Sequence, residues 1–111
     1  MTQINVSELI IVKVTYTVKA SFARQNQQNI DAALQEVRAL NNPDIRYSAL
    51  IGEDGKTFTH LAIFKNATAQ QLLLNLPVFK SFQQQRDDSG LETAPQIEVM
   101  QLASSSYDIF N

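Results

Sequence analysis

His60 is the side chain of this sequence that is best suited to moving a proton. It is the only histidine, and imidazole is the side chain whose ordinary pKa lies near neutral pH. Alternation along residues 57–65 places His60 on one face of a strand with Phe58 and Ala62. Two readings stay open: a general base in a pocket, or a partly buried histidine satisfied by a tyrosine hydroxyl or a backbone carbonyl.

Four aromatic residues could form a ligand-binding wall around His60: Tyr16, Tyr47, Phe64 and Phe82. The first three lie on the inward faces of expected strands, and Phe82 lies on the inward face of an expected helix. We place the first and third strands side by side and parallel, so that Tyr16 and Phe64, both late in their strands, should come close. Inward tyrosines are also common as core residues whose ring is buried and whose hydroxyl reaches water. A one-residue error in register would move a strand's whole set to the other face.

Metal and cofactor chemistry has little support in the sequence. One histidine and no cysteine cannot supply a typical zinc site, and the lack of cysteine excludes thiolate catalysis. There is no glycine-rich phosphate loop and no nucleotide-binding fingerprint. The adjacent carboxylates of Asp87 and Asp88 fall in residues 87–90, which we expect to be a solvent-exposed loop. We therefore predict no metal and no bound cofactor.

Length and charge limit the class of protein. The 111 residues predict a single domain over 1–111, with a core at about 9–102 and a C-terminal tail at 103–111. Nine basic and eleven acidic residues give a net charge of −2, which argues against nucleic acid as a partner. The longest apolar run, Leu9–Val12, is too short to span a membrane, and no signal peptide is evident. We expect a cytoplasmic protein.

A β-hairpin over residues 44–65 organises the expected elements. Two runs rich in β-branched and aromatic residues flank Glu53-Asp54-Gly55-Lys56, and Gly55 tolerates the positive φ of a tight turn. The runs predict strands over residues 45–51 and 57–65.

A strand and a helix are expected on each side of this hairpin. Before it, residues 8–19 alternate as a strand, and 21–40 form a helix ended by Pro43, with the Gln/Asn run at 25–29 on its solvated face. After it, the pattern predicts a helix over 67–75 capped by Asn66, a restart over 77–86, and a strand over 96–102.

This order of elements, βαββαβ, is that of a ferredoxin-like α+β sandwich. Its two helices can cover only one face of the sheet. The opposite face carries an apolar set consisting of Ile11, Leu50, Leu61, Ile63, Met100 and Leu102. Such a patch predicts a partner, and the simplest is a second copy packed sheet against sheet. We therefore predict a homodimer through this face.

Two short motifs resemble a known superfamily. Leu61–Lys65 reads LAIFK and is followed by a polar helix start, and Leu76–Phe82 reads LPVFKSF. Over about residues 9–102 the chain resembles the dimeric α+β barrel superfamily, which includes antibiotic-biosynthesis-type and small haem-degrading monooxygenases. The resemblance implies a dimeric α+β barrel with a pocket between the sheet and the helices of each subunit.

The resemblance does not extend to the residues of haem degradation. Haem-degrading members carry an Asn on the first strand, a Trp at the end of the third and a His on the second helix. Matched by eye, these positions hold Tyr16, Phe64 and Gln83 or Phe82 here. Because the helix offers no axial ligand for iron, we do not expect haem degradation.

Two functions remain open from the sequence. The first is a cofactor-independent, monooxygenase-like enzyme that takes a small hydrophobic or aromatic molecule, with His60 as its catalytic residue. The second is a non-catalytic dimeric module that binds a ligand or another protein. Fold resemblance alone does not separate them.

Overall fold

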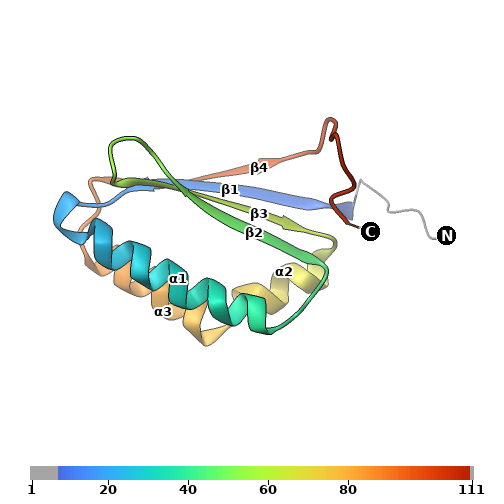
Figure 1. Cartoon of the computed structure of the whole chain (residues 1–111), viewed down its shortest axis with the longest axis horizontal. Helices are drawn as coiled ribbons and strands as arrows, with labels where there is room; N and C mark the ends of the chain where they lie inside the picture. The colour runs from blue at the N-terminus through green and yellow to red at the C-terminus, as the bar shows by residue number, and fades with distance from the viewer. Residues whose placement is uncertain (1–7, 111) are drawn as a thin grey trace.

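The computed structural model describes residues 8–110, which form a four-stranded sheet with helices on one face (Figure 1). The strands are β1 (Ile10–Thr17), β2 (Ile45–Ile51), β3 (Thr57–Phe64) and β4 (Thr93–Met100). The helical segments are a short 3-10 turn η2 (Ala20–Phe22), α1 (Ala23–Ala39), α2 (Ala67–Leu74) and α3 (Pro77–Asp88). The expected ferredoxin-like α+β order is confirmed.

The strand order is β2-β3-β1-β4, and every neighbouring pair is antiparallel. The expectation that the first and third strands are parallel was wrong. A helix returns the chain between β1 and β2, and the hairpin then reverses it, so β3 runs against β1. Tyr16 therefore pairs with Phe58, whereas Phe64 pairs with Ile10 at the other end of β1.

Local signals set the hairpin between β2 and β3. Gly55 has a φ of +72°, the left-handed conformation that glycine accepts without strain. A carboxylate oxygen of Asp54 accepts hydrogen bonds from the backbone N–H groups of Lys56 and Thr57, which closes the turn. The register that follows pairs Ala49 with His60 and Tyr47 with Ala62.

The ends of the second helical region follow their caps. The side-chain oxygen of Asn66 accepts a hydrogen bond from the backbone N–H of Ala69, as expected of an N-cap, and Pro77 begins α3. The expected loop at 87–90 begins too early, because α3 continues through Asp88 and ends with Ser89 donating to the carbonyl of Arg86.

The last strand starts earlier than the sequence suggested. It begins at Thr93 and includes Pro95, which sits where the register between β1 and β4 shifts. Proline is tolerated there because β4 is an edge strand and the shift removes the need for one ladder hydrogen bond. No helix among residues 8–110 is both long and apolar enough to cross a membrane.

The core lies between the sheet and the helices. β3 alternates so that Phe58, His60, Ala62 and Phe64 are buried on the helix side. From the helices, buried apolar side chains meet them, among them Ile30, Ala33, Leu73, Phe79 and Phe82.

The opposite face of the sheet is mixed in character. Ile11 is buried, whereas Leu61 and Ile63 are partly exposed and Leu50 is more than half exposed. The C-terminal tail contributes Phe110, which is buried, and the guanidinium of Arg46 lies 5.2 Å from the centre of its ring. Figure 1 shows the tail returning to the end of the sheet where β1 begins.

Candidate functional site

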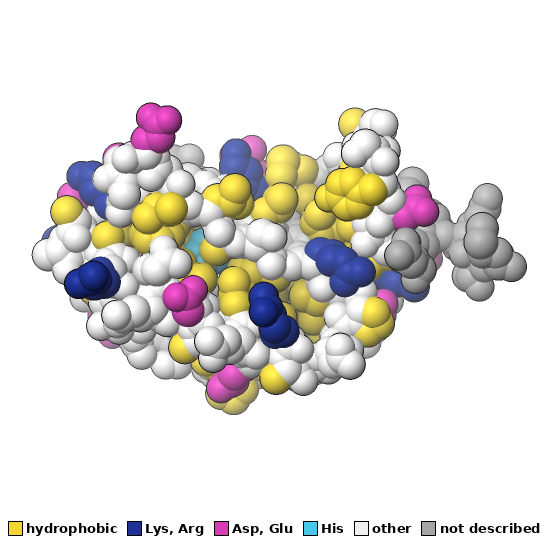
Figure 2. Space-filling view, viewed as in Figure 1, with side chains coloured by type: hydrophobic (Ala, Val, Ile, Leu, Met, Phe, Trp, Pro, Cys, Tyr) yellow, Lys and Arg dark blue, Asp and Glu magenta, His cyan; other side chains and the backbone are white. Residues whose placement is uncertain are grey.

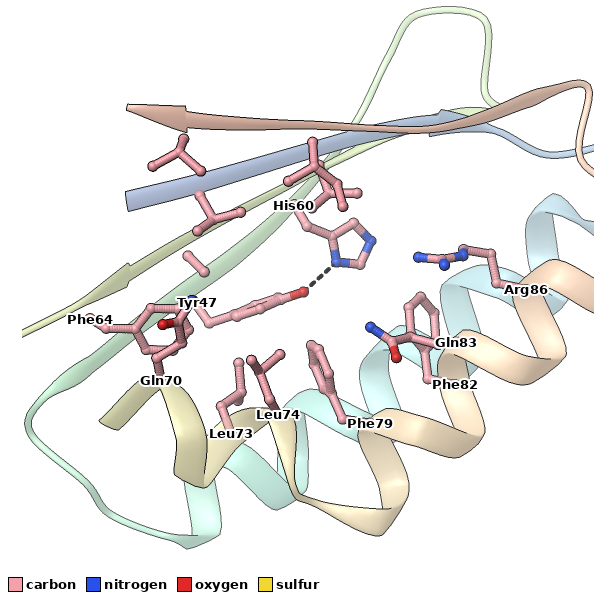
Figure 3. Close-up of a pocket in the computed structure, with 15 residues that line it drawn as sticks. Tyr47, His60, Phe64, Gln70, Leu73, Leu74, Phe79, Phe82, Gln83 and Arg86 are labelled. Atoms are coloured by element: carbon pink, nitrogen blue, oxygen red, sulfur yellow. Dashed lines mark hydrogen bonds between the residues drawn. The ribbon is translucent and has the colours of Figure 1, made fainter. Parts of the chain in front are cut away.

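A cavity of about 300 Å³ opens between the helix face of the sheet and helices α2 and α3 (Figure 3). Its walls are mostly apolar, and side chains from all four strands and both helices reach it. Figure 2 views the molecule from the side of α1 and β2, and the single histidine is visible there between yellow apolar side chains. The cavity has the size and lining of a site for a small, mostly apolar molecule.

Four of the five expected site residues line this cavity: Tyr47, His60, Phe64 and Phe82. The fifth, Tyr16, does not reach it. Its side chain has no exposed surface and lies behind His60, with its ring stacked on Phe58 at 5.8 Å between centres. Because β1 and β3 are antiparallel, Tyr16 and Phe64 lie at opposite ends of the pair of strands. The expected contact between them was therefore wrong.

His60 is held from both sides by tyrosine hydroxyls. Its Nε2 lies 2.8 Å from the hydroxyl of Tyr16, and its Nδ1 lies 2.7 Å from the hydroxyl of Tyr47. Tyr16 in turn accepts a hydrogen bond of 2.9 Å from the Nδ2 of Asn26. The result is one chain of hydrogen bonds, Asn26–Tyr16–His60–Tyr47, which runs from the core beside α1 to the cavity wall. We call it the polar chain.

Burial keeps the members of the polar chain neutral at pH 7. Burial, together with the nearby positive charge of Arg86, lowers the pKa of His60 to about 4. It raises the pKa of Tyr16 to about 12, although the hydrogen bond from Asn26 and the charge of Arg86 oppose the rise. It also raises the pKa of Tyr47, well above that of a free phenol. A histidine with so low a pKa and both nitrogens paired is a weak base toward a ligand.

Sequence analysis missed Asn26. The Gln/Asn run was assigned to a solvated helix face, but Asn26 is 1% exposed. The signal was available, because Asn26 lies four residues before Ile30 and seven before Ala33, on the same buried stripe of α1. A polar residue on an apolar stripe needs a partner, and here the partner is Tyr16.

The polar groups that α3 sends to the cavity were not among the predicted site residues. Gln83 and Arg86 both line it. Arg86 follows Phe82 by four residues, so it shares the inward face of α3, and its guanidinium carbon lies 5.2 Å from the centre of the Tyr16 ring. Figure 3 shows Arg86 pointing from α3 toward His60.

The cavity is open along the edge strand β4. Ile97 and Val99 of β4 line it but remain 68% and 77% exposed. Among residues 8–110, no group of three or more His, Cys, Asp or Glu side chains is placed to hold a metal ion.

No protein-family model and no curated protein matches this sequence. Solved structures do match its fold. A Caulobacter crescentus protein assigned as an antibiotic biosynthesis monooxygenase is 18% identical, with a TM-score of 0.75 over 87% of this chain and 92% of that one. Rv0793 from Mycobacterium tuberculosis is 14% identical, with a TM-score of 0.75 over 89% and 99%.

A third match is a variant of SnoaB, a cofactor-independent oxygenase from Streptomyces nogalater. It is 11% identical, with a TM-score of 0.69 over 91% of this chain and 99% of that one. At these identities a likeness shows the fold alone. The chain therefore has the ferredoxin-like α+β fold of the antibiotic-biosynthesis-monooxygenase structures, as the resemblance of its motifs implied.

Proposed function

We propose that this protein binds a small, mostly apolar or aromatic molecule in the cavity between the sheet and helices α2 and α3. The observation that carries the proposal is the cavity itself, about 300 Å³ in volume, with apolar walls and a few convergent polar groups on one side. These polar groups are Tyr47, His60, Gln83 and Arg86, and one further polar side chain, Gln70, lines the cavity from α2. Aromatic rings of Tyr47, Phe79 and Phe82 offer faces and edges against which a flat ligand can pack.

The finer proposal is that the bound molecule is oxygenated without a cofactor, as the description of SnoaB suggests for a protein of this fold. In such a reaction one atom of O₂ enters the substrate and the other leaves as water. A CH₂ group that becomes C=O supplies all the electrons, so the substrate must be electron-rich and readily deprotonated. In this proposal His60 acts through the hydroxyl of Tyr47, since its own nitrogens are both paired.

The same pairing favours a second candidate function, a non-catalytic ligand-binding module. A neutral imidazole with a pKa lowered to about 4 and no free nitrogen is suited to holding its neighbours in place. The two functions share the cavity and differ in whether oxygen is consumed.

The cavity can be tested by filling it from α2. Leu74 and Leu72 are each 41% exposed, but only Leu74 lines the cavity, and Figure 3 shows it pointing toward the sheet. We expect 1-naphthol to raise the melting temperature of the wild type by about 5 °C or more at saturating concentration, because binding stabilises the folded state alone. Leu74→Trp should lose this shift, and Leu72→Trp should keep it.

An equal shift in Leu74→Trp and the wild type would place the ligand elsewhere and contradict the proposal. Oxygen uptake in the presence of a dihydroxynaphthalene, followed with an electrode, then separates the two functions. Uptake that is present in the wild type and lost in Leu74→Trp supports oxygenation. Binding without uptake supports the non-catalytic module.

We also propose that two copies associate through the sheet face opposite the helices. Leu61 and Ile63 of the central strand β3 are partly exposed there. Ile63 pairs with the buried Ile11 of β1, and Leu61 lies opposite Lys13 of β1 and Ser48 of β2. Polar pairs occupy the rest of the face, with hydroxyls of Thr17 and Thr57 2.9 Å apart. The apolar part supplies the contact and the polar part fixes its register.

Leu61→Asp is expected to separate the copies. Burying an unpaired carboxylate costs several kcal/mol, so association should weaken about a thousandfold. Leu72→Asp makes the same change on α2, outside the sheet, and should leave association unchanged. Sedimentation velocity at micromolar concentration should show a dimer for the wild type and Leu72→Asp and a monomer for Leu61→Asp. A monomeric wild type, or a dimeric Leu61→Asp, would refute the interface.

A further inference from the structure

We propose that Asn26, which lies outside the cavity, determines the hydrogen-bonding group that the cavity offers to its ligand. Acting through Tyr16 and His60, Asn26 leaves the hydroxyl hydrogen of Tyr47 free to donate. Asn26 is thus a positioning residue, and Tyr47 is the group that meets the ligand. The ligand this favours carries an oxygen that can accept a hydrogen bond. The ligand part of this inference rests on the proposed binding function, whereas the direction of the polar chain does not.

The direction in which each hydrogen bond of the polar chain is donated follows from counting the hydrogens along it. The Nδ2 of Asn26 donates to the oxygen of Tyr16 at 2.9 Å. Each tyrosine hydroxyl carries one hydrogen, and a neutral imidazole carries one on its ring nitrogens. His60 is the only other hydrogen-bond partner of the Tyr16 hydroxyl among residues 8–110, so the hydrogen of Tyr16 points at Nε2 of His60, 2.8 Å away. Because Nε2 accepts, the ring hydrogen is on Nδ1 and points at the oxygen of Tyr47, 2.7 Å away.

That count leaves one hydrogen unused, the hydroxyl hydrogen of Tyr47. Among residues 8–110, His60 is the only hydrogen-bond partner of this hydroxyl. Tyr47 lines the cavity, and Figure 3 places its hydroxyl between the sheet and α3, facing the space bounded by Phe79 and Phe82. The hydrogen can therefore be given to a bound ligand.

The opposite direction is disfavoured by the burial of Asn26, which is 1% exposed. In the observed orientation its Oδ1 is the atom left without a partner within the described chain. Turning the amide over would pair that oxygen with Tyr16 but would leave both hydrogens of Nδ2, rather than one, without a partner in the core. The turn would exchange an unpaired carbonyl oxygen for an unpaired N–H, and unpaired buried N–H groups are the rarer of the two in folded proteins. Arg86, whose guanidinium lies over the Tyr16 ring, further disfavours a second proton on His60.

The tautomer of His60 tests this directly. Because His60 is the only histidine, a protein prepared without a histidine tag and labelled with ¹⁵N-histidine gives one pair of ring signals. Protonated and unprotonated ring nitrogens have widely separated ¹⁵N shifts. We expect Nδ1 protonated and Nε2 unprotonated in the wild type, the reverse of the tautomer that dominates in free histidine.

Variants then test whether the hydrogen bond from Asn26 to Tyr16 determines the tautomer of His60. Asn26→Leu removes the donor, and Tyr16→Phe removes the link while keeping the buried ring; either should raise the fraction protonated at Nε2. Gln27→Leu changes the exposed neighbouring position on α1 and should leave the signals unchanged. A wild type protonated at Nε2 overturns the inference. A tautomer that is the same in the wild type, Asn26→Leu and Tyr16→Phe also overturns the inference. If Asn26→Leu does not fold, the result for Tyr16→Phe decides.

Two bicyclic probes of similar size test the consequence for binding. 1-Indanone can only accept a hydrogen bond, and indole can only donate one. We expect 1-indanone to bind about tenfold more tightly than indole, and Tyr47→Phe to abolish the difference. Tighter binding of indole overturns the assignment of Tyr47 as donor. If neither probe binds, the proposed binding function fails, and the tautomer measurement still decides the direction of the polar chain.

Discussion

Replacing Tyr16 with alanine is expected to lower the free energy of unfolding by about 4 kcal/mol, the range measured when large aromatic residues are removed from protein cores. The side chain has no exposed surface, its ring stacks on Phe58, and its hydroxyl joins Asn26 to His60. The change would therefore leave a cavity and also strand two buried polar groups. A domain of this size has a total stability of roughly 5–15 kcal/mol, so much of it would be lost.

A second variant divides this loss into its parts. Tyr16→Phe keeps the ring and should cost about 1–3 kcal/mol, the price of leaving buried partners unsatisfied. Tyr107→Ala removes a tyrosine that is 70% exposed in the tail and should change stability by less than about 0.5 kcal/mol. Urea denaturation measures all three. A loss below about 1 kcal/mol in Tyr16→Ala would mean that Tyr16 is not the central packing residue described above.

Much of the fold could be predicted because its signals are local. The positive φ of Gly55, the cap formed by Asn66 and the start of α3 at Pro77 each depend on residues within one turn of the chain. Alternation in β3 placed His60 and Phe64 on the buried face. Successive side chains alternate between the two faces of a strand, so an error in where the strand begins or ends does not change the face on which a residue lies.

The direction of neighbouring strands could not be read in this local way. It depends on how many times the chain reverses between β1 and β3, and one wrong step turned an antiparallel pair into a parallel one. That error alone brought Tyr16 and Phe64 together in the expected site. The contact of Tyr16 with His60 was still foreseeable, because both side chains lie on the helix face of adjacent strands.

The polar chain shows what sequence reasoning misses when it judges residues by type. Asn26 was grouped with its glutamine neighbours and Arg86 was given no role, although both share a helix face with buried residues. Their roles depend on tertiary contacts, with Tyr16 for Asn26 and with the cavity for Arg86. Periodicity places such residues at the core, but only the packed structure says what they contact.

Acidification is expected to destabilise the protein through His60. The folded pKa of His60 is about 4, and the unfolded value is 6.5. Between these values the unfolded chain binds a proton that the folded chain excludes, so the free energy of unfolding falls as pH falls from 6.5 to 4 and then levels off. A difference of this size corresponds to about 3 kcal/mol. The other ionisable groups facing His60 are Tyr16, Tyr47 and Arg86, and burial raises the pKa of both tyrosines, so neither tyrosine ionises in this range.

His60→Gln is the control, because glutamine can still donate and accept hydrogen bonds but does not titrate. Carboxylates elsewhere titrate in both proteins, so the quantity to compare is the difference between wild type and variant in chemical denaturation from pH 7 to pH 4. We expect the wild type to lose about 3 kcal/mol more than the variant over this range. Parallel stability curves would mean that the imidazole is protonated as easily in the folded protein as in the unfolded chain. His60 would then be open to water and free to act as a base, and the tyrosines could not be holding both of its nitrogens.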